Sequence, residues 1–259
     1  MKKNFLIVLI ALFFVSCNDK EKNMEISEYT VTDFKYDIQL LGSIHNECMD
    51  YVIRHLNAND IENIMTKSEY YGLSFLNSYG FSDEDVEQVL FSFERNYYRR
   101  FELDTVLWFQ DDVERLSEDQ KKVLRLINNV IESNDNIGSL LSNLEQVEDS
   151  IIRNGTYETQ YIAIVAVEIA KSSLTYWYNN EYIWRDLVDM ESKERWFNWK
   201  SVGREDVKGA VAGATGVGVA SVVSGPPGWA AGTATVVGSS AGASLADAAG
   251  QVWDHFFGK

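Results

Sequence analysis

Few side chains in this 259-residue chain could perform chemistry, and His45, Cys48 and Glu168 stand out among them. His45 and Cys48 are three residues apart, so on a helix they would share a face and could form a Cys–His nucleophile. They also fit an apolar stripe, and we favour this interpretation of both as members of a core. Glu168 stands in an apolar run, where a charged carboxylate is costly without a partner, and we expect a Lys or Arg from a neighbouring helix to supply one.

The sequence lacks the motifs that usually mark catalytic and cofactor sites. The patterns GxSxG, HExxH, CxxC and GxxxxGK[ST] do not occur, and a partial dinucleotide motif at residues 216–221 lacks its third glycine. The histidines, His45, His55 and His255, are too scattered to predict a metal site. We therefore expect no enzymatic activity, no cofactor and no metal, and an envelope enzyme that uses His45, Cys48 or Glu168 is the weakest of the alternatives.

Composition limits the classes of partner. The formal net charge of −16 opposes phosphate backbones, which argues against a nucleic-acid partner. Apolar residues make up 46% of the chain and aromatic residues 13%, so we expect a substantial buried core rather than disorder.

The N-terminal segment predicts export. Two lysines precede a short apolar run, which is typical of a signal peptide over residues 1–16. The run ends in Phe-Val-Ser-Cys, which resembles a bacterial lipobox; an ordinary signal peptide with a coincidental cysteine is the alternative. The resemblance implies that Cys17 is acylated (palmitate among its lipids) and becomes the mature N-terminus, followed by a polar tether over residues 17–35. The charged residues at the start of this tether resemble the surface-export signals of Bacteroidetes-type lipoproteins. This resemblance implies a lipid-anchored envelope protein at the outer membrane, in the periplasmic or surface-exposed leaflet.

Helical periodicity dominates the middle of the chain, so the predicted fold class is all-α. A stripe over residues 36–57 indicates one helix, and Ser82 begins another with acidic residues in its first turn. Ser117 and Gln120 form a capping box before a further helix. Further periodic or apolar runs lie at Ile137–Ile151, with Gly155 as a stop, and at Tyr161–Ala170, which is apolar nearly all round and predicts an enclosed central helix. These segments together predict an all-helical domain over residues 36–200.

The hexapeptide Leu41-Gly42-Ser43-Ile44-His45-Asn46 resembles a Gly-x-x-His-Asn pattern of small uncharacterised Bacteroidetes-type lipoproteins. Members of that group can also carry a glycine-rich C-terminal segment. The resemblance implies location and layout, and no activity.

Aromatic residues gather over residues 176–199. Trp177 and Trp184 fit a core, whereas Trp196, Trp199 and Lys200 directly precede a glycine-rich stretch and predict a belt at a membrane–water interface.

Residues 201–259 are predicted to form a glycine-zipper helical hairpin. No charged side chain occurs from 209 to 246, and small residues recur four apart, which places them on one helix face where another backbone can approach. The sequence Gly225-Pro226-Pro227-Gly228 predicts a turn between helices at roughly 206–224 and 229–250. The glycines expected to pack helices are Gly209, Gly213, Gly228, Gly232, Gly238 and Gly242.

This segment resembles the glycine-zipper hairpins of some outer-membrane lipoproteins and the Gly-rich helices of class II bacteriocins. The zipper is less regular than in the former, and no double-glycine leader precedes it. Two functions follow: a non-enzymatic envelope lipoprotein whose hairpin associates with a membrane or self-associates as a homo-oligomer, or a bacteriocin-like or pore-forming effector whose helical domain shields the hairpin.

Overall fold

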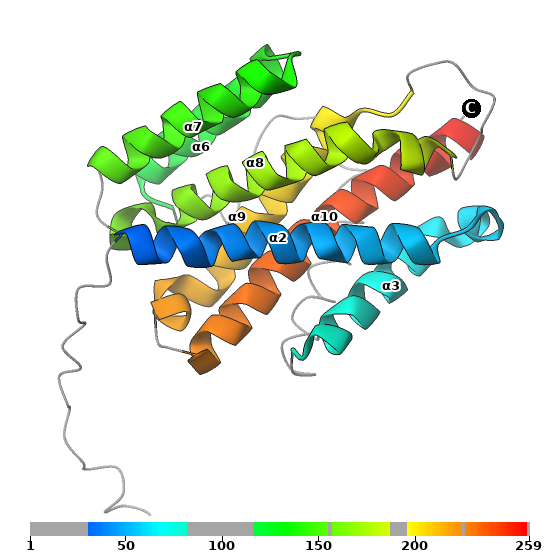
Figure 1. The fold of residues 1–259 in the computed structure, drawn as a ribbon, viewed down its shortest axis with the longest axis horizontal. Coiled ribbons are helices and arrows are strands. Elements are labelled where there is room, and N and C mark those ends of the chain that lie inside the picture. The colour runs from blue at the N-terminus through cyan, green and yellow to red at the C-terminus, as the bar shows by residue number, and fades with distance from the viewer. Residues whose placement is uncertain (1–30, 82–115, 155–156, 187–195, 224–225, 258–259) are drawn as a thin grey trace, which may run out of the picture. The chain divides into compact units, whose positions relative to one another are not determined.

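The computed structural model describes residues 31–81, 116–154, 157–186, 196–223 and 226–257, and these residues are helical with no strand among them. The predicted all-α class is therefore confirmed. Residues Lys35–Lys259 form one compact unit, and Met1–Phe34 form another, of which only the start of helix α2 is described. The elements are α2 (Val31–His55), η1 (Ala58–Asn63), α3 (Ile64–Tyr79), α6 (Glu118–Ser133), α7 (Ile137–Asn154), α8 (Tyr157–Asp186), α9 (Trp199–Val223) and α10 (Pro226–Phe257) (Figure 1).

Helix α8 is the central helix of the larger unit. It contacts α6, α7, α9 and α10, and every residue from 161 to 170 is buried, as its all-round apolar sequence predicts. Trp177 and Trp184 are fully buried near its C-terminal half, which confirms their predicted place in the core.

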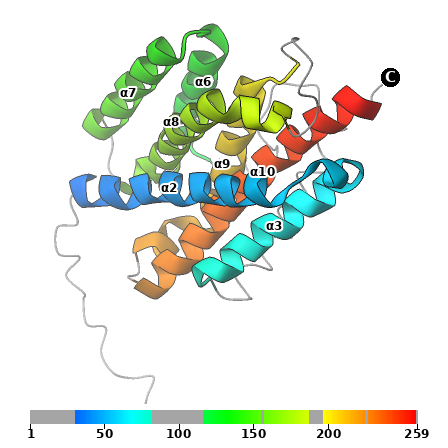
Figure 2. The same ribbon diagram turned by 45° about the vertical axis from the view of Figure 1, so that its right-hand side comes forward.

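Helices α6 and α7 pack against each other and against α8 (Figure 2). The predicted capping box begins α6: the Ser117 hydroxyl accepts from the Gln120 backbone N–H, and the Gln120 side chain accepts from the Ser117 N–H. Helix α7 buries Leu140, Leu144 and Ile151 on one face, in agreement with the predicted stripe.

Helices α9 and α10 pack extensively against each other. A Cβ built on Gly209 would lie 2.2 Å from the Ser239 carbonyl oxygen, and one on Gly213 would lie 2.7 Å from the Thr235 carbonyl oxygen. Glycine is therefore required where the two backbones meet, because any side chain would occupy the space of the facing helix.

The predicted turn at the two prolines is wrong in detail. Pro226 and Pro227 are the first residues of α10, since the first turn of a helix needs no N–H donor and tolerates proline. The link between the helices falls on residues 224–225, outside the described part of the chain. Both helices also extend beyond the predicted bounds, and the predicted domain boundary at residue 200 falls inside α9.

Helix α3 was not predicted from the sequence. It ends at Gly80, which has φ 100° and caps the helix by donating its N–H to the carbonyls of Asn77 and Leu76. It packs against α10 and contributes Phe75 and Leu76 to the core. The helix predicted from Ser82 lies outside the described residues.

In the described part of the chain, no helix combines the length and the apolar character needed to cross a membrane.

Candidate functional site

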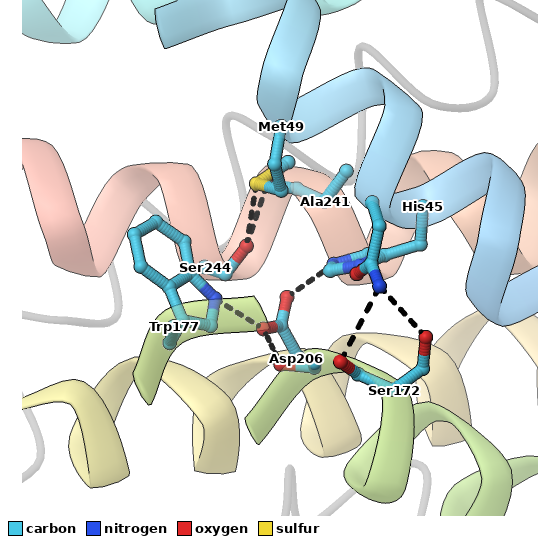
Figure 3. A network of polar contacts seen from close by, with 9 residues as sticks. His45, Met49, Ser172, Trp177, Asp206, Ala241 and Ser244 are labelled. Atoms are coloured by element: carbon cyan, nitrogen blue, oxygen red, sulfur yellow. Dashed lines mark hydrogen bonds and ion pairs between the residues drawn. The ribbon is translucent and has the colours of Figure 1, made fainter. Parts of the chain in front are cut away.

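A buried polar cluster lies where α2, α8 and α9 meet (Figure 3). Its centre is Asp206 of α9, which has no exposed surface. One carboxylate oxygen lies 2.7 Å from Nε2 of His45 on α2. The other accepts from two donors of α8, the Ser173 hydroxyl and, at 2.9 Å, the indole N–H of Trp177. Two helices thus direct three donors at the carboxylate of a third helix, which offsets the cost of burying its charge.

The other side of the His45 ring faces Asn46. Nδ1 of His45 lies 3.0 Å from Oδ1 of Asn46. The amide orientation follows from Ser172: Nδ2 of Asn46 is 3.4 Å from the Ser172 carbonyl oxygen, which can only accept, and 2.9 Å from its hydroxyl oxygen. Oδ1 must therefore face the ring. Both ring nitrogens of His45 then face acceptors, which is the environment of a doubly protonated imidazolium.

The electrostatics of His45 agree with this geometry. Complete burial alone would lower the pKa of His45, but the charge and hydrogen bond of Asp206, together with the hydrogen bond to Asn46, raise the pKa above its ordinary value. The pair is therefore a buried ion pair, His45⁺ with Asp206⁻.

Gly42 explains why α2 approaches α8 so closely at this point. A Cβ on Gly42 would lie 2.7 Å from both the Cβ and the Oγ of Ser172. One turn later in α2, His45 and Asn46 reach α8 and α9. The Gly-x-x-His-Asn hexapeptide is thus the segment through which α2 docks on these helices.

The cluster has the residue types of a nucleophilic site but not its geometry. The Ser173 hydroxyl donates to Asp206 and not to His45, so the imidazole does not face it as a base. Cys48 is buried and has a free thiol, and its burial, followed by the charge of Asp206, raises the pKa of that thiol. A thiolate is therefore disfavoured at the one cysteine near His45, and Cys48 is the small core residue that its stripe predicts.

Helix α2 also reaches α10. The Ser244 hydroxyl lies 3.5 Å from the Met49 sulfur and 3.2 Å from the Ala241 carbonyl oxygen (Figure 3). Met49 and Ser244 are both fully buried. Through this contact, the glycine-rich helix α10 packs against α2.

A second buried cluster joins α7 to α8. Lys171 Nζ lies 2.7 Å from Glu148 Oε2 and 3.0 Å from Glu168 Oε1. Two carboxyl groups share one ammonium, and burial, followed by a hydrogen bond to Glu148, raises the pKa of Glu168 to about 7. The expected cation for Glu168 is therefore present, but the prediction that it comes from a neighbouring helix was wrong: it lies one turn further along α8, and the neighbouring helix supplies Glu148.

The predicted site residues are dispersed in the structure. Cys17 lies outside the described residues, so its lipidation stays a prediction. Gly209 and Gly213 contact the backbone of α10, as described above. Gly228 is in the first turn of α10, and Gly232, Gly238 and Gly242 are buried along it.

The residues of the predicted interfacial belt make contacts within the chain. Trp196 stacks on His255 with ring centroids 4.4 Å apart, and Trp199 is buried and makes a T-shaped ring contact with Tyr178. Lys200 pairs at 2.7 Å with Asp135, in the link between α6 and α7. A role at a membrane surface stays a prediction.

Sequence reasoning missed Asp206, although a signal was present. Spacings of three place it between Gly203 and Gly209, on the side of α9 that small residues keep free for close packing. An acidic residue on such a side indicates a buried charge, and a buried charge requires a partner on a facing helix.

Among the described residues, no group of three or more His, Cys, Asp or Glu side chains is arranged to hold a metal ion. Comparison with protein-family models, with curated proteins and with solved structures gave no match to this chain.

Proposed function

We propose that this chain is a non-enzymatic envelope protein, anchored through a lipid on Cys17, whose α9–α10 pair associates with a membrane or with a second copy. The observation that carries the proposal is the direct backbone contact at Gly209 and Gly213 in a segment without charge from 209 to 246. Small-residue contact of this kind is the usual means by which helices pack in lipid, where burial of apolar area no longer drives association.

The buried polar clusters also support a role without catalysis. His45 and Asp206 have no exposed surface, and each faces partners fixed by other helices. A reacting group must reach its substrate, so this arrangement suits the holding of helices better than the turnover of a substrate.

Vesicle flotation tests the membrane part of this proposal. The full chain and its Cys17→Ser variant are mixed with vesicles of phosphatidylethanolamine and phosphatidylglycerol, so that the lipid anchor and the helix pair are separated. We expect the Cys17→Ser variant to retain part of the binding and to lose it when Gly209→Val is added. Chemical crosslinking of the same samples reports self-association. A Cys17→Ser chain that stays monomeric and does not bind the vesicles would overturn the proposal.

The enclosure of α10 favours a second candidate function. In it, the chain is a membrane-active effector whose α9–α10 pair stays covered by the other helices until these helices move away. Every residue from 232 to 246 is buried, and α3 lies against this helix. A helix enclosed in this way cannot meet a membrane until its covering helices move away.

A crosslink between α2 and α10 tests this candidate. Met49→Cys and Ser244→Cys are combined in a Cys48→Ser background, because the two native side chains touch. We expect the oxidised protein to cause no leakage of dye from vesicles and the reduced protein to cause leakage. Equal leakage in both states would contradict release, and the Met49→Cys single variant controls for the reductant.

A further inference from the structure

The cluster around Asp206 is the polar junction of three helices that are far apart in the sequence. Helix α2 supplies His45 and Asn46, α8 supplies Ser172, Ser173 and Trp177, and α9 supplies Asp206 (Figure 3). Asp50 of α2 also acts on Tyr176 of α8: burial, followed by the charge of Asp50, raises the pKa of the Tyr176 phenol, so this phenol keeps its proton near neutral pH.

We propose that His45 is a buried proton switch: its imidazolium holds α2 against α8 and α9 through Asp206 and Asn46, a contact that we call the clasp. Loss of one proton from the ring opens the clasp.

The hydrogen-bond geometry makes the second proton necessary. A neutral imidazole has one donor and one acceptor, so one ring nitrogen would present a lone pair either to Asn46 Oδ1 or to the Asp206 carboxylate. Asn46 is held by Ser172, and Asp206 is held by Ser173 and Trp177. Neither partner can turn a donor toward the ring without breaking its own hydrogen bonds.

The charge balance adds to this cost. A deprotonated His45 leaves the Asp206 carboxylate buried without a counter-charge, which is among the more destabilising arrangements in a protein interior. Two penalties therefore arise with the loss of one proton. Both are relieved when α2 moves away and water reaches the carboxylate.

Among the groups around His45, the proton of His45 itself is the one that we expect to be lost as the pH rises. On α2 the titratable neighbour is Cys48, whose thiol stays protonated because its pKa is raised. Helix α8 presents a hydroxyl and an indole, and α9 presents Asp206. On the side of α10, residues 232–246 carry no charge.

The sign of the response follows from the raised pKa of His45. Below the ordinary value of 6.5 both the folded and the unfolded chain hold the proton, so the clasp contributes fully. As the pH rises from there through the raised pKa, the contribution is lost. The clasp is therefore closed in mildly acidic solution and opens toward alkaline pH.

Opening of the contact between α2 and its neighbours would also uncover the α9–α10 pair, a point that rests on the function proposed above. The clasp itself is tested without a membrane, so its failure and that of the proposed function are distinguishable.

Cys48 provides the readout, because it is buried one turn from His45 and is the only thiol in a full chain carrying Cys17→Ser. The rate of maleimide labelling is measured across the pH range and divided by the rate for the same chain unfolded in urea, which removes the intrinsic pH dependence of thiol chemistry. We expect protection to fall by up to about tenfold per pH unit, the limit for one proton, as the pH rises from 6.5 to the raised pKa of His45, and to level off above it.

The matched variants are His45→Gln, which should abolish this pH dependence, and His55→Gln, an exposed histidine on the same helix, which should retain it. Parallel curves for His45→Gln and its parent would overturn the proposal. If His45→Gln fails to fold, Asn46→Ala serves instead: it removes the acceptor at Nδ1 and should move the opening to lower pH, and an unchanged opening would overturn the proposal.

Nitrogen-15 NMR of histidine-labelled protein reads the proton directly. Both ring nitrogens of His45 should be protonated near pH 7, and the loss of one should coincide with the loss of Cys48 protection. A neutral ring at or below pH 6.5 would contradict the switch.

Discussion

At the scale of single residues, Asp206 determines how α2, α8 and α9 meet. Its carboxylate accepts from His45, Ser173 and Trp177, and each donor is fully buried. A carboxylate satisfied in this way fixes the position of every helix that contributes a donor, because a small displacement breaks a charge-assisted hydrogen bond.

Removal of His45 should therefore be strongly destabilising. In His45→Ala the Asp206 carboxylate stays buried without its counter-charge, and we expect a loss of about 3–5 kcal/mol in the free energy of unfolding. Urea denaturation at neutral pH measures this change. His55→Ala, on the exposed face of the same helix, should cost less than about 1 kcal/mol, and equal losses in the two variants would contradict the buried ion pair.

Glu168 should make stability depend on pH in a defined direction. Its pKa is about 7 in the folded chain against an ordinary value of 4.5, so between these values the folded state holds a proton that the unfolded state has lost. The free energy of unfolding should then fall as the pH rises from about 4.5 to about 7.

Glu168→Gln should remove this dependence, because a neutral amide can occupy the place of the protonated acid beside Glu148. Denaturation at pH 5 and pH 8 should give more similar stabilities for the variant than for the parent. Glu118→Gln is the contrasting control: hydrogen bonding to Lys121 lowers the pKa of Glu118, so its contribution is lost as the pH falls. A Glu168→Gln profile as steep as that of the parent would contradict the shared proton.

At the scale of elements, the α9–α10 pair depends on the absence of side chains at two positions. Gly209→Ala replaces a poor helix former with the best one, worth about 1 kcal/mol, but its Cβ would lie 2.2 Å from the Ser239 carbonyl oxygen. The obstacle is backbone, which cannot yield without separating the helices. We expect a net destabilisation of about 1–3 kcal/mol, measured by urea denaturation.

Gly138→Ala is the matched control for this substitution. Gly138 is exposed on α7, and its added Cβ would meet only a side-chain oxygen of Asn136, at 3.2 Å. This variant should gain up to about 1 kcal/mol from helix propensity. A gain in both variants would mean that the helices are not in close contact at Gly209.

The same elements indicate how far sequence reasoning reaches. Periodicity predicted α2, α6, α7 and the enclosed part of α8, because each carries a long apolar stripe or run. Helix α3 was missed, since its apolar residues are interrupted by polar and tyrosine side chains and its buried set includes Ser68 and Gly72. The Asp206 cluster was missed for a different reason: its members lie on three helices, and pairing between helices depends on packing that no local pattern encodes.

At the scale of the whole molecule, the two buried clusters together set a proton balance. Asp206, Glu148 and Glu168 are three buried carboxyl groups, whereas His45 and Lys171 supply two positive charges. The two clusters together are neutral only while one further proton stays on the Glu148–Glu168 pair. Each proton lost above neutral pH therefore adds an unpaired negative charge to the core around α8.

The compact unit should accordingly be most stable in mildly acidic solution and lose stability as the pH rises from about 5 through the raised pKa values of Glu168 and His45, the reverse of ordinary acid denaturation. Each kcal/mol corresponds to about 2–4 °C in melting temperature for a domain of this size, so calorimetry should register a decrease of several degrees. The double variant His45→Gln/Glu168→Gln removes both buried protons and should flatten the profile over this range. His55→Gln/Glu118→Gln alters the same residue types at exposed positions and should keep the decrease, and a decrease of equal size in both double variants would show that the buried clusters do not govern it.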